Sequence, residues 1–97
     1  SVIDYYGVMA KKLGVEVRPL DPRGKAQADT RGNLVLLDVD GPAALAGLQP
    51  GGIILGVNGK SVESVRDLQA QVRKSGKSVA LRIERNNTEI FVPVRIG

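Results

Sequence analysis

Residues 39–62 read VDGPAALAGLQPGGIILGVNGKSV, a run divided by glycine and proline. Pro42 suits the first turn of a helix, and Gly47 is a residue that can end it. Residues 53–57 are apolar and read as a strand. The pair Asn58-Gly59 favours a tight hairpin turn, so the chain can pair back briefly on that strand. The stretch therefore predicts a short helix followed by a β-hairpin.

Strand patterns flank this stretch on both sides. Residues 13–17 alternate apolar and other side chains, as a strand with one buried face does, and Pro19 ends it or marks its edge. Residues 34–39 are mostly apolar, so we expect a buried strand there. Asparagine tolerates the positive φ of a two-residue turn, and the turn at Asn86-Asn87 joins the last expected strands, residues 78–84 and 88–96.

Residues 64–75 carry the strongest helix pattern. Ser64 can cap this helix, and Asp67, three residues on, completes a capping box. Gly76 follows and predicts a left-handed stop. An apolar stripe at helical spacing is formed by Val65, Leu68 and Val72.

The remaining segments predict little regular structure. Residues 19–33 contain prolines, glycines and polar side chains without an apolar period, so we expect a loop with at most a turn of helix. Residues 1–12 are expected to be a lead-in or linker, and residues 13–97 the domain. The fold class is α+β, with a small curled antiparallel sheet of about five to six strands capped by one long and one short helix.

Composition excludes several classes of protein. The chain has 97 residues and a mass of 10.3 kDa, which suits one domain. It has no cysteine and no histidine, so disulfides, thiolate or imidazole metal sites and Ser-His or Cys-His nucleophile pairs are excluded. No apolar run approaches the ~20 residues of a membrane-spanning helix. We expect no cofactor, no catalytic residue and no membrane insertion, and the Ser1 start suggests a fragment of a longer chain.

The net charge of +4 raises the question of nucleic-acid binding. The basic residues are scattered among acidic ones, which is typical of a mixed, solvated surface. Single-strand binders need aromatic platforms, and the few aromatic residues here are Tyr5, Tyr6 and Phe91. Nucleic acid is therefore not an expected partner.

Two short motifs are best interpreted as structural. Gly59-Lys60-Ser61 resembles the end of a phosphate-binding loop, but Ile54 stands where that motif needs a glycine. Asp38 and Asp40 share a strand face, yet no third acidic ligand follows at loop spacing. We interpret these as turn glycines and solvated strand-end charges.

Residues 12–19 read KLGVEVRP and carry the most informative chemistry. Gly14 lets the backbone bend where the strand begins, so successive N–H groups can point outward as an anion-binding nest. If the strand lies at a sheet edge, an extended peptide can add to it and place its C-terminal carboxylate in the nest. On this segment alone, a plain strand start with a convenient glycine remains the alternative.

The pattern Leu13-Gly14-Val15-x-Val17-x-Pro19 resembles the peptide-binding loop and strand of PDZ domains in HtrA/Deg-type serine proteases. Residues 39–62 are similar to that family's signature, roughly x-PAA-x-AGL-x-PGD-x-I-x-x-xNG-x-x-V. The resemblance covers residues 13–96, and it implies the bacterial, circularly permuted PDZ type, most like the second, C-terminal PDZ of a Do-type protease. Gly52 stands where the family usually has Asp, which brings the bonding at the start of the next strand into question.

The resemblance also implies a groove between residues 13–18 and the helix at 64–75. The first residues would bind a carboxylate, with Lys12 as a cation beside it, and residues 15–18 would receive the peptide strand. The helix would turn Leu68 to the core and one face, at i, i+4 and i+7, to the groove. The expected peptide-binding residues are Lys12, Leu13, Gly14, Val15, Glu16, Val17, Arg18, Val65, Gln69 and Val72.

By resemblance, the parent chain is a periplasmic serine endopeptidase and chaperone of protein quality control. This chain would be its peptide-binding module, capturing C-terminal or hydrophobic segments of unfolded envelope proteins. Two alternatives stay open: an oligomer-assembly contact of the same protease, and a PDZ domain of a site-two protease or a type II secretion component. The expected partners are peptides or unfolded C-termini with an apolar last residue, and the protease and neighbouring PDZ domains of the parent oligomer.

Overall fold

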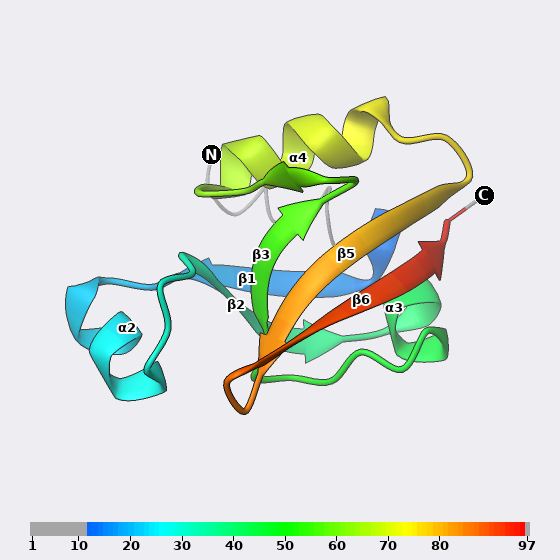
Figure 1. Ribbon diagram of the computed structural model, residues 1–97. Coiled ribbons are helices and arrows are strands. Elements are labelled where there is room, and N and C mark those ends of the chain that lie inside the picture. Colours follow the sequence, from blue (N-terminus) through cyan, green and yellow to red (C-terminus); the bar gives the residue numbers. More distant parts are fainter. Residues whose placement is uncertain (1–11, 97) are drawn as a thin grey trace.

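Five strands lie side by side in one antiparallel sheet, in the order β1-β2-β3-β5-β6, and a sixth, β4, pairs with β3 (Figure 1). This is the arrangement in a computed structural model that describes residues 12–96. The strands are β1 (Val15–Pro19), β2 (Leu34–Val39), β3 (Ile53–Val57), β4 (Lys60–Ser61), β5 (Ser78–Arg85) and β6 (Thr88–Arg95). The predicted antiparallel sheet and α+β class are confirmed.

Three helices lie within residues 14–96: α2 (Pro22–Ala28), α3 (Gly41–Leu45) and α4 (Val65–Lys74). The long helix α4 packs against β1 and β3, and the short helix α3 packs against β6. Helix α2 projects from the opposite end of β1, away from α4 (Figure 1). The expected long and short helices are therefore present, and α2 is additional. No helix among residues 12–96 is long and apolar enough to cross a membrane.

One hydrophobic core joins the sheet to α3 and α4. It contains aliphatic side chains from every strand except β4, and no polar side chain among residues 12–96 is buried. Burying an aliphatic side chain of this size contributes ~1.5–3 kcal/mol. The largest fully buried side chains are Leu13, Leu34, Leu36, Ile54, Leu68, Leu81 and Ile83.

The predicted turns are confirmed by their backbone angles. Asn58, Asn86 and Asn87 all have positive φ, as two-residue hairpin turns require. Gly47 has φ of +91° directly after α3 and its cap, as expected for a helix stop. The backbone bonding at the start of β3, which Gly52 brought into question, is present. The Gly52 carbonyl accepts a hydrogen bond from the Leu36 N–H at 2.8 Å.

Helix α4 begins as predicted and ends differently. The Ser64 hydroxyl accepts from the Asp67 N–H at 3.0 Å, while the Asp67 carboxylate accepts from the Glu63 N–H, one residue before the expected partner. The helix is capped at Ser75 in an extended conformation, and Gly76 does not have a positive φ. The predicted left-handed stop at Gly76 is therefore wrong.

Residues 19–33 differ from the predicted loop because they include α2. Asp21 caps this helix by accepting from the Gly24 N–H at 2.7 Å, and Pro22 occupies its first turn. The helix buries no residue, so the segment has no apolar period. Hydrophobic pattern alone therefore could not find it.

The first strand also starts later than predicted. Leu13 is helical and Gly14 has φ of +80°, so β1 begins only at Val15. The predicted lead-in, residues 1–12, lies outside the described residues except for Lys12. In β2, a bulge leaves Leu37 without a partner on β1, and its side chain is 41% exposed, so this strand is only half buried.

Candidate functional site

Among the described strands, β1 pairs only with β2, so within residues 12–96 its outer side is an unpaired sheet edge. Two backbone bonds flank it: Asp40 N–H to the Gly14 carbonyl at 2.6 Å, and Leu20 N–H to the Asn33 carbonyl at 2.7 Å. Backbone N–H and C=O groups alternate sides along a strand, so those of the even-numbered residues between 14 and 20 point toward β2. The odd-numbered residues therefore direct their N–H and C=O groups to the outer edge.

Val15 and Val17 are the residues that offer this edge both a donor and an acceptor. Pro19, the last residue of β1, offers only its carbonyl, and its missing N–H removes no bond to β2. The valine side chains are buried, whereas those of Glu16 and Arg18 are exposed. Strand β1 thus has one buried face and ends at a proline, as predicted.

Gly14 occupies a position that excludes any side chain. A Cβ built there would lie 1.9 Å from the Asp40 carbonyl oxygen, and φ is +80°. The backbone is right-handed helical at Leu13 and has a positive φ at Gly14. This succession of right-handed and left-handed residues is the geometry of an anion-binding nest. Asp40 also caps α3 by accepting from the Gly41 N–H, so it ties this bend to the start of that helix.

Helix α4 forms the other wall of the candidate groove, because it packs against β1. Val65 and Gln69 are half-buried, and Val72 is 3% exposed. Leu68 is fully buried in the core, as predicted. The structure therefore brings the predicted helix residues and β1 to the same region of the molecule.

The four aliphatic side chains predicted to line a slot between these walls are nearly fully buried. Leu13, Val15, Val17 and Val72 are 0–3% exposed and belong to the hydrophobic core. The structure thus shows these side chains as core residues beside a strand edge that no other described strand pairs with except β2 on its inner side.

Lys12 bridges the two walls. Its Nζ donates a hydrogen bond to the Val72 carbonyl oxygen at 3.2 Å, between residues far apart in the sequence. The same carbonyl accepts from the Ser75 N–H at 3.1 Å in the last turn of α4. The structure therefore places two of the predicted peptide-binding residues in direct contact.

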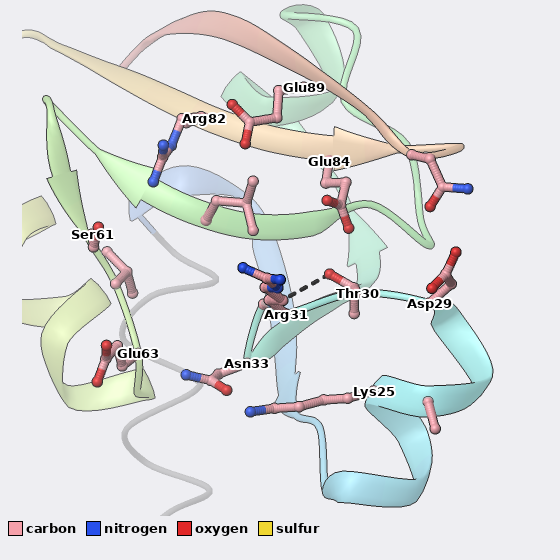
Figure 2. Close-up of a pocket in the computed structure, with 15 residues that line it drawn as sticks. Lys25, Asp29, Thr30, Arg31, Asn33, Ser61, Glu63, Arg82, Glu84 and Glu89 are labelled. Carbon is pink, nitrogen blue, oxygen red and sulfur yellow. Dashed lines mark hydrogen bonds between the residues drawn. The ribbon is translucent and has the colours of Figure 1, made fainter.

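A separate hollow of about 610 Å³ lies between α2, the β3–β4 hairpin and the strands β5 and β6 (Figure 2). Its lining mixes Lys25, Arg31 and Arg82 with Glu84 and Glu89. None of the ten predicted peptide-binding residues lines it. The sequence prediction missed it together with α2, although Asp21-Pro22 is a helix-start signal.

The mixed charges of this hollow do not define a metal centre. Within residues 12–96, no three His, Cys, Asp or Glu side chains are grouped to hold a metal ion. The outer edge of β1 beside α4 remains the candidate site.

The antiparallel sheet, the glycine bend and the helix beside an open edge define a class of domain. The PDZ domain family matches residues 36–85, which is half of the chain and runs from β2 through β5. The chain belongs to the PDZ domain family.

Its relatives are proteases of one type. A probable periplasmic serine endoprotease, DegP-like, of Pseudomonas fulva is 34% identical over 91 residues, covering 91% of this chain and 19% of that protein. The corresponding protein of Chlamydia trachomatis is 38% identical over 97 residues, covering 92% of this chain and 19% of its own length. The chain thus spans about a fifth of the length of the curated relatives it matches.

A solved structure agrees with these matches. The HtrA-type protease AlgW, solved with a decapeptide, superposes with a TM-score of 0.72 at 28% identity, covering 88% of this chain and 28% of that chain. The chain is therefore related to the PDZ domains of HtrA/DegP-like serine proteases.

Proposed function

We propose that this chain binds the C-terminal segments of polypeptides, which add as an antiparallel strand to the outer edge of β1 beside α4. The observation that carries the proposal is the free edge at Val15 and Val17, next to the nest-like bend at Gly14. The related protease AlgW was solved with a decapeptide, which supports a peptide as the ligand class.

The side chains of the slot favour an apolar last residue in the ligand. Leu13, Val15, Val17 and Val72 are aliphatic, and burying an apolar ligand side chain among them is worth ~1.5–3 kcal/mol. Val65 favours a second apolar side chain further up the peptide. Each backbone hydrogen bond adds ~1 kcal/mol net. Ordering the peptide opposes binding, so we expect micromolar or weaker affinity, about 8 kcal/mol or less.

In the whole protein, such a module would tether unfolded periplasmic proteins for an attached serine endopeptidase. The curated relatives, named as probable periplasmic serine endoproteases, support this role, and the catalytic residues would lie elsewhere in the parent. The connection at residues 19–33 favours the second PDZ domain of a Do-type protease. The sequence upstream of Ser1 tests this, because it should encode a Gly-Asn-Ser-Gly-Gly motif and then another PDZ domain.

Backbone methylation of a ligand tests strand addition without altering the protein. A labelled peptide ending in valine is titrated by fluorescence anisotropy, with one backbone nitrogen methylated at a time. Antiparallel pairing directs alternate N–H groups toward β1. We therefore expect methylation to abolish binding at alternate residues and to be tolerated at those between, which serve as matched controls. Equal tolerance at every position, or equal loss at every position, would refute the pairing.

A second candidate function is an assembly contact within the parent oligomer. Leu45 on α3 and Phe91 on β6 are 91% and 73% exposed, which is unusual for large apolar side chains and favours a protein partner. Analytical ultracentrifugation of the parent protein, with Leu45→Glu and Phe91→Glu, tests this role. A smaller oligomer with unchanged peptide affinity would support it, and an unchanged oligomer would exclude it.

A further inference from the structure

We propose that the hollow between α2 and the sheet is a second binding site. It holds an extended internal segment of a polypeptide, with the basic side chains of that segment toward the sheet and the acidic ones toward α2. The inference is independent of the proposed binding at β1, because none of the residues expected there lines the hollow. The volume of about 610 Å³ falls within the roughly 300–1,000 Å³ of ligand-binding clefts.

The wall formed by α2 and the loop after it is basic overall. It contributes Lys25 and Arg31 to the lining, against the single carboxylate of Asp29. Figure 2 shows Arg31 pointing from the loop toward the sheet, with Lys25 extending from α2. Ligand side chains that reach this wall are therefore favoured when they are acidic.

The facing wall, formed by the sheet and the β3–β4 hairpin, is acidic overall. It contributes Glu63, Glu84 and Glu89 to the lining, against Arg82. The Arg82 guanidinium lies along β3, because a Cβ built at Gly56 would be 3.3 Å from its Nε. Figure 2 likewise shows Arg82 directed toward β3 rather than toward Glu84. Ligand side chains that reach this wall are favoured when they are basic.

Glu84 and Glu89 form an unfavourable pair that a ligand cation would relieve. They lie directly opposite one another on β5 and β6. The two-residue turn between these strands is flanked by Arg85 and Thr88 as a hydrogen-bonded pair. The next pair, Glu84 with Glu89, is therefore non-hydrogen-bonded, which brings its side chains closer together. Like charges opposite each other destabilise a sheet, so a lysine or arginine placed between these carboxylates offsets their repulsion.

The charges of the two walls are not paired with each other. Within residues 12–96, none of these seven charged side chains forms an ion pair or a side-chain hydrogen bond. The side-chain hydrogen bond in the lining, from the Gly32 N–H to the Thr30 hydroxyl at 3.0 Å, involves neither set of charges (Figure 2). The hollow thus holds opposite charges apart, and a ligand that carries both signs can bridge them.

The hollow also offers backbone groups that suit a polypeptide. Ser61 of β4 lines it, and among the described strands β4 pairs only with β3. Lys60 pairs with Val57 across the turn, and the Val62 N–H donates to the Leu55 carbonyl at 3.0 Å, so these neighbours face β3. By alternation, the N–H and C=O of Ser61 face away from β3. An extended segment can bond to them, which favours a polypeptide over a small charged molecule.

Two walls of opposite charge select for the order of charges in the ligand. Successive side chains of an extended chain point to opposite sides. A segment in which basic and acidic residues alternate singly therefore presents one sign to each wall. The same residues alternating in pairs present both signs to each wall, so their composition is identical and their fit is poorer.

The test compares two octapeptides of lysine and glutamate, one alternating singly and one in pairs. Both are acetylated and amidated, so they lack the free carboxylate proposed to bind at β1. Each is titrated into the ¹⁵N-labelled chain and followed by backbone amide shifts in NMR spectra. We expect the singly alternating peptide to bind about two- to tenfold more tightly, as exposed ion pairs allow. Its largest shifts should fall on Arg31, Ser61 and Glu84, and the preference should weaken at high salt.

Neutralising the sheet wall with Glu84→Gln and Glu89→Gln together should lower the affinity of the singly alternating peptide about two- to tenfold and remove its preference. Glu16 and Asp38 are an exposed acidic cross-strand pair outside the hollow. Glu16→Gln with Asp38→Asn is therefore the matched control and should leave the preference unchanged. Equal affinity of the two peptides for the unmodified chain, larger shifts along β1 than around the hollow, or an equal loss in both double variants overturns the inference.

Discussion

Replacing Gly14 by alanine tests the bend on which the groove depends. A left-handed backbone costs an L-residue roughly 1–2 kcal/mol, and φ at Gly14 is +80°. The new Cβ would also lie 1.9 Å from the Asp40 carbonyl oxygen, so the backbone must shift. That shift disrupts the 2.6 Å bond between the Asp40 N–H and the Gly14 carbonyl, worth about 1 kcal/mol. We expect a total loss of ~2–4 kcal/mol, which lowers Tm by roughly 8–30 °C.

Gly59→Ala is a matched control, because Gly59 has nearly the same φ, +82°, with no atom within 4 Å of the added Cβ. It should lose only the backbone contribution of roughly 1–2 kcal/mol. Urea unfolding followed by circular dichroism measures both variants. If the two lose the same stability within about 0.5 kcal/mol, the close approach of Gly14 to Asp40 is not present and the reasoning fails.

Three further substitutions test helix α4, the second wall of the proposed groove. Val72→Glu places a carboxylate at a position that is 3% exposed, so we expect a loss above ~3 kcal/mol in urea unfolding, whereas Gln69→Ala, at a half-buried position, should stay within about 0.5 kcal/mol. A stable Val72→Glu variant would mean that this side chain faces solvent. Ser64→Ala removes the acceptor of the Asp67 N–H and should lower stability by ~0.5–2 kcal/mol in the same assay; no change would show that the cap is not formed in solution.

Most of the fold could be predicted because short-range signals mark where its elements begin and end. Asn58-Gly59 and Asn86-Asn87 specify tight hairpins through the positive φ that these residues tolerate. Ser64 specifies the start of α4 through one side-chain hydrogen bond. Because these interactions join residues only a few positions apart, they can be recognised from the local sequence alone.

What could not be predicted depends on packing or on distant partners. Helix α2 buries no residue, so it has no hydrophobic period to detect. Gly76 could adopt a left-handed stop, but α4 is capped by Ser75 through the Val72 carbonyl. The Lys12–Val72 bond joins two elements through the tertiary fold, and no local pattern encodes it. The packing of α4 beside β1 could be predicted, whereas this long-range bond could not.

The two ends of the sheet are not equivalent places for an added strand. On β5, the N–H and C=O of Ala80 both bond to Asn58, each at 2.8 Å, so Ala80 does not bond to its β6 neighbour Pro93. Pro93 therefore faces the outer edge of β6, where its missing N–H interrupts the ladder that a guest strand needs.

At the other end, β1 presents Val15 and Val17 without interruption and has its proline only at the last residue, Pro19. A guest strand on β6 would lose a hydrogen bond in the middle of its pairing, and one on β1 would not. The positions of these two prolines thus discourage edge-to-edge association at β6 and leave β1 as the edge where strand addition is favoured.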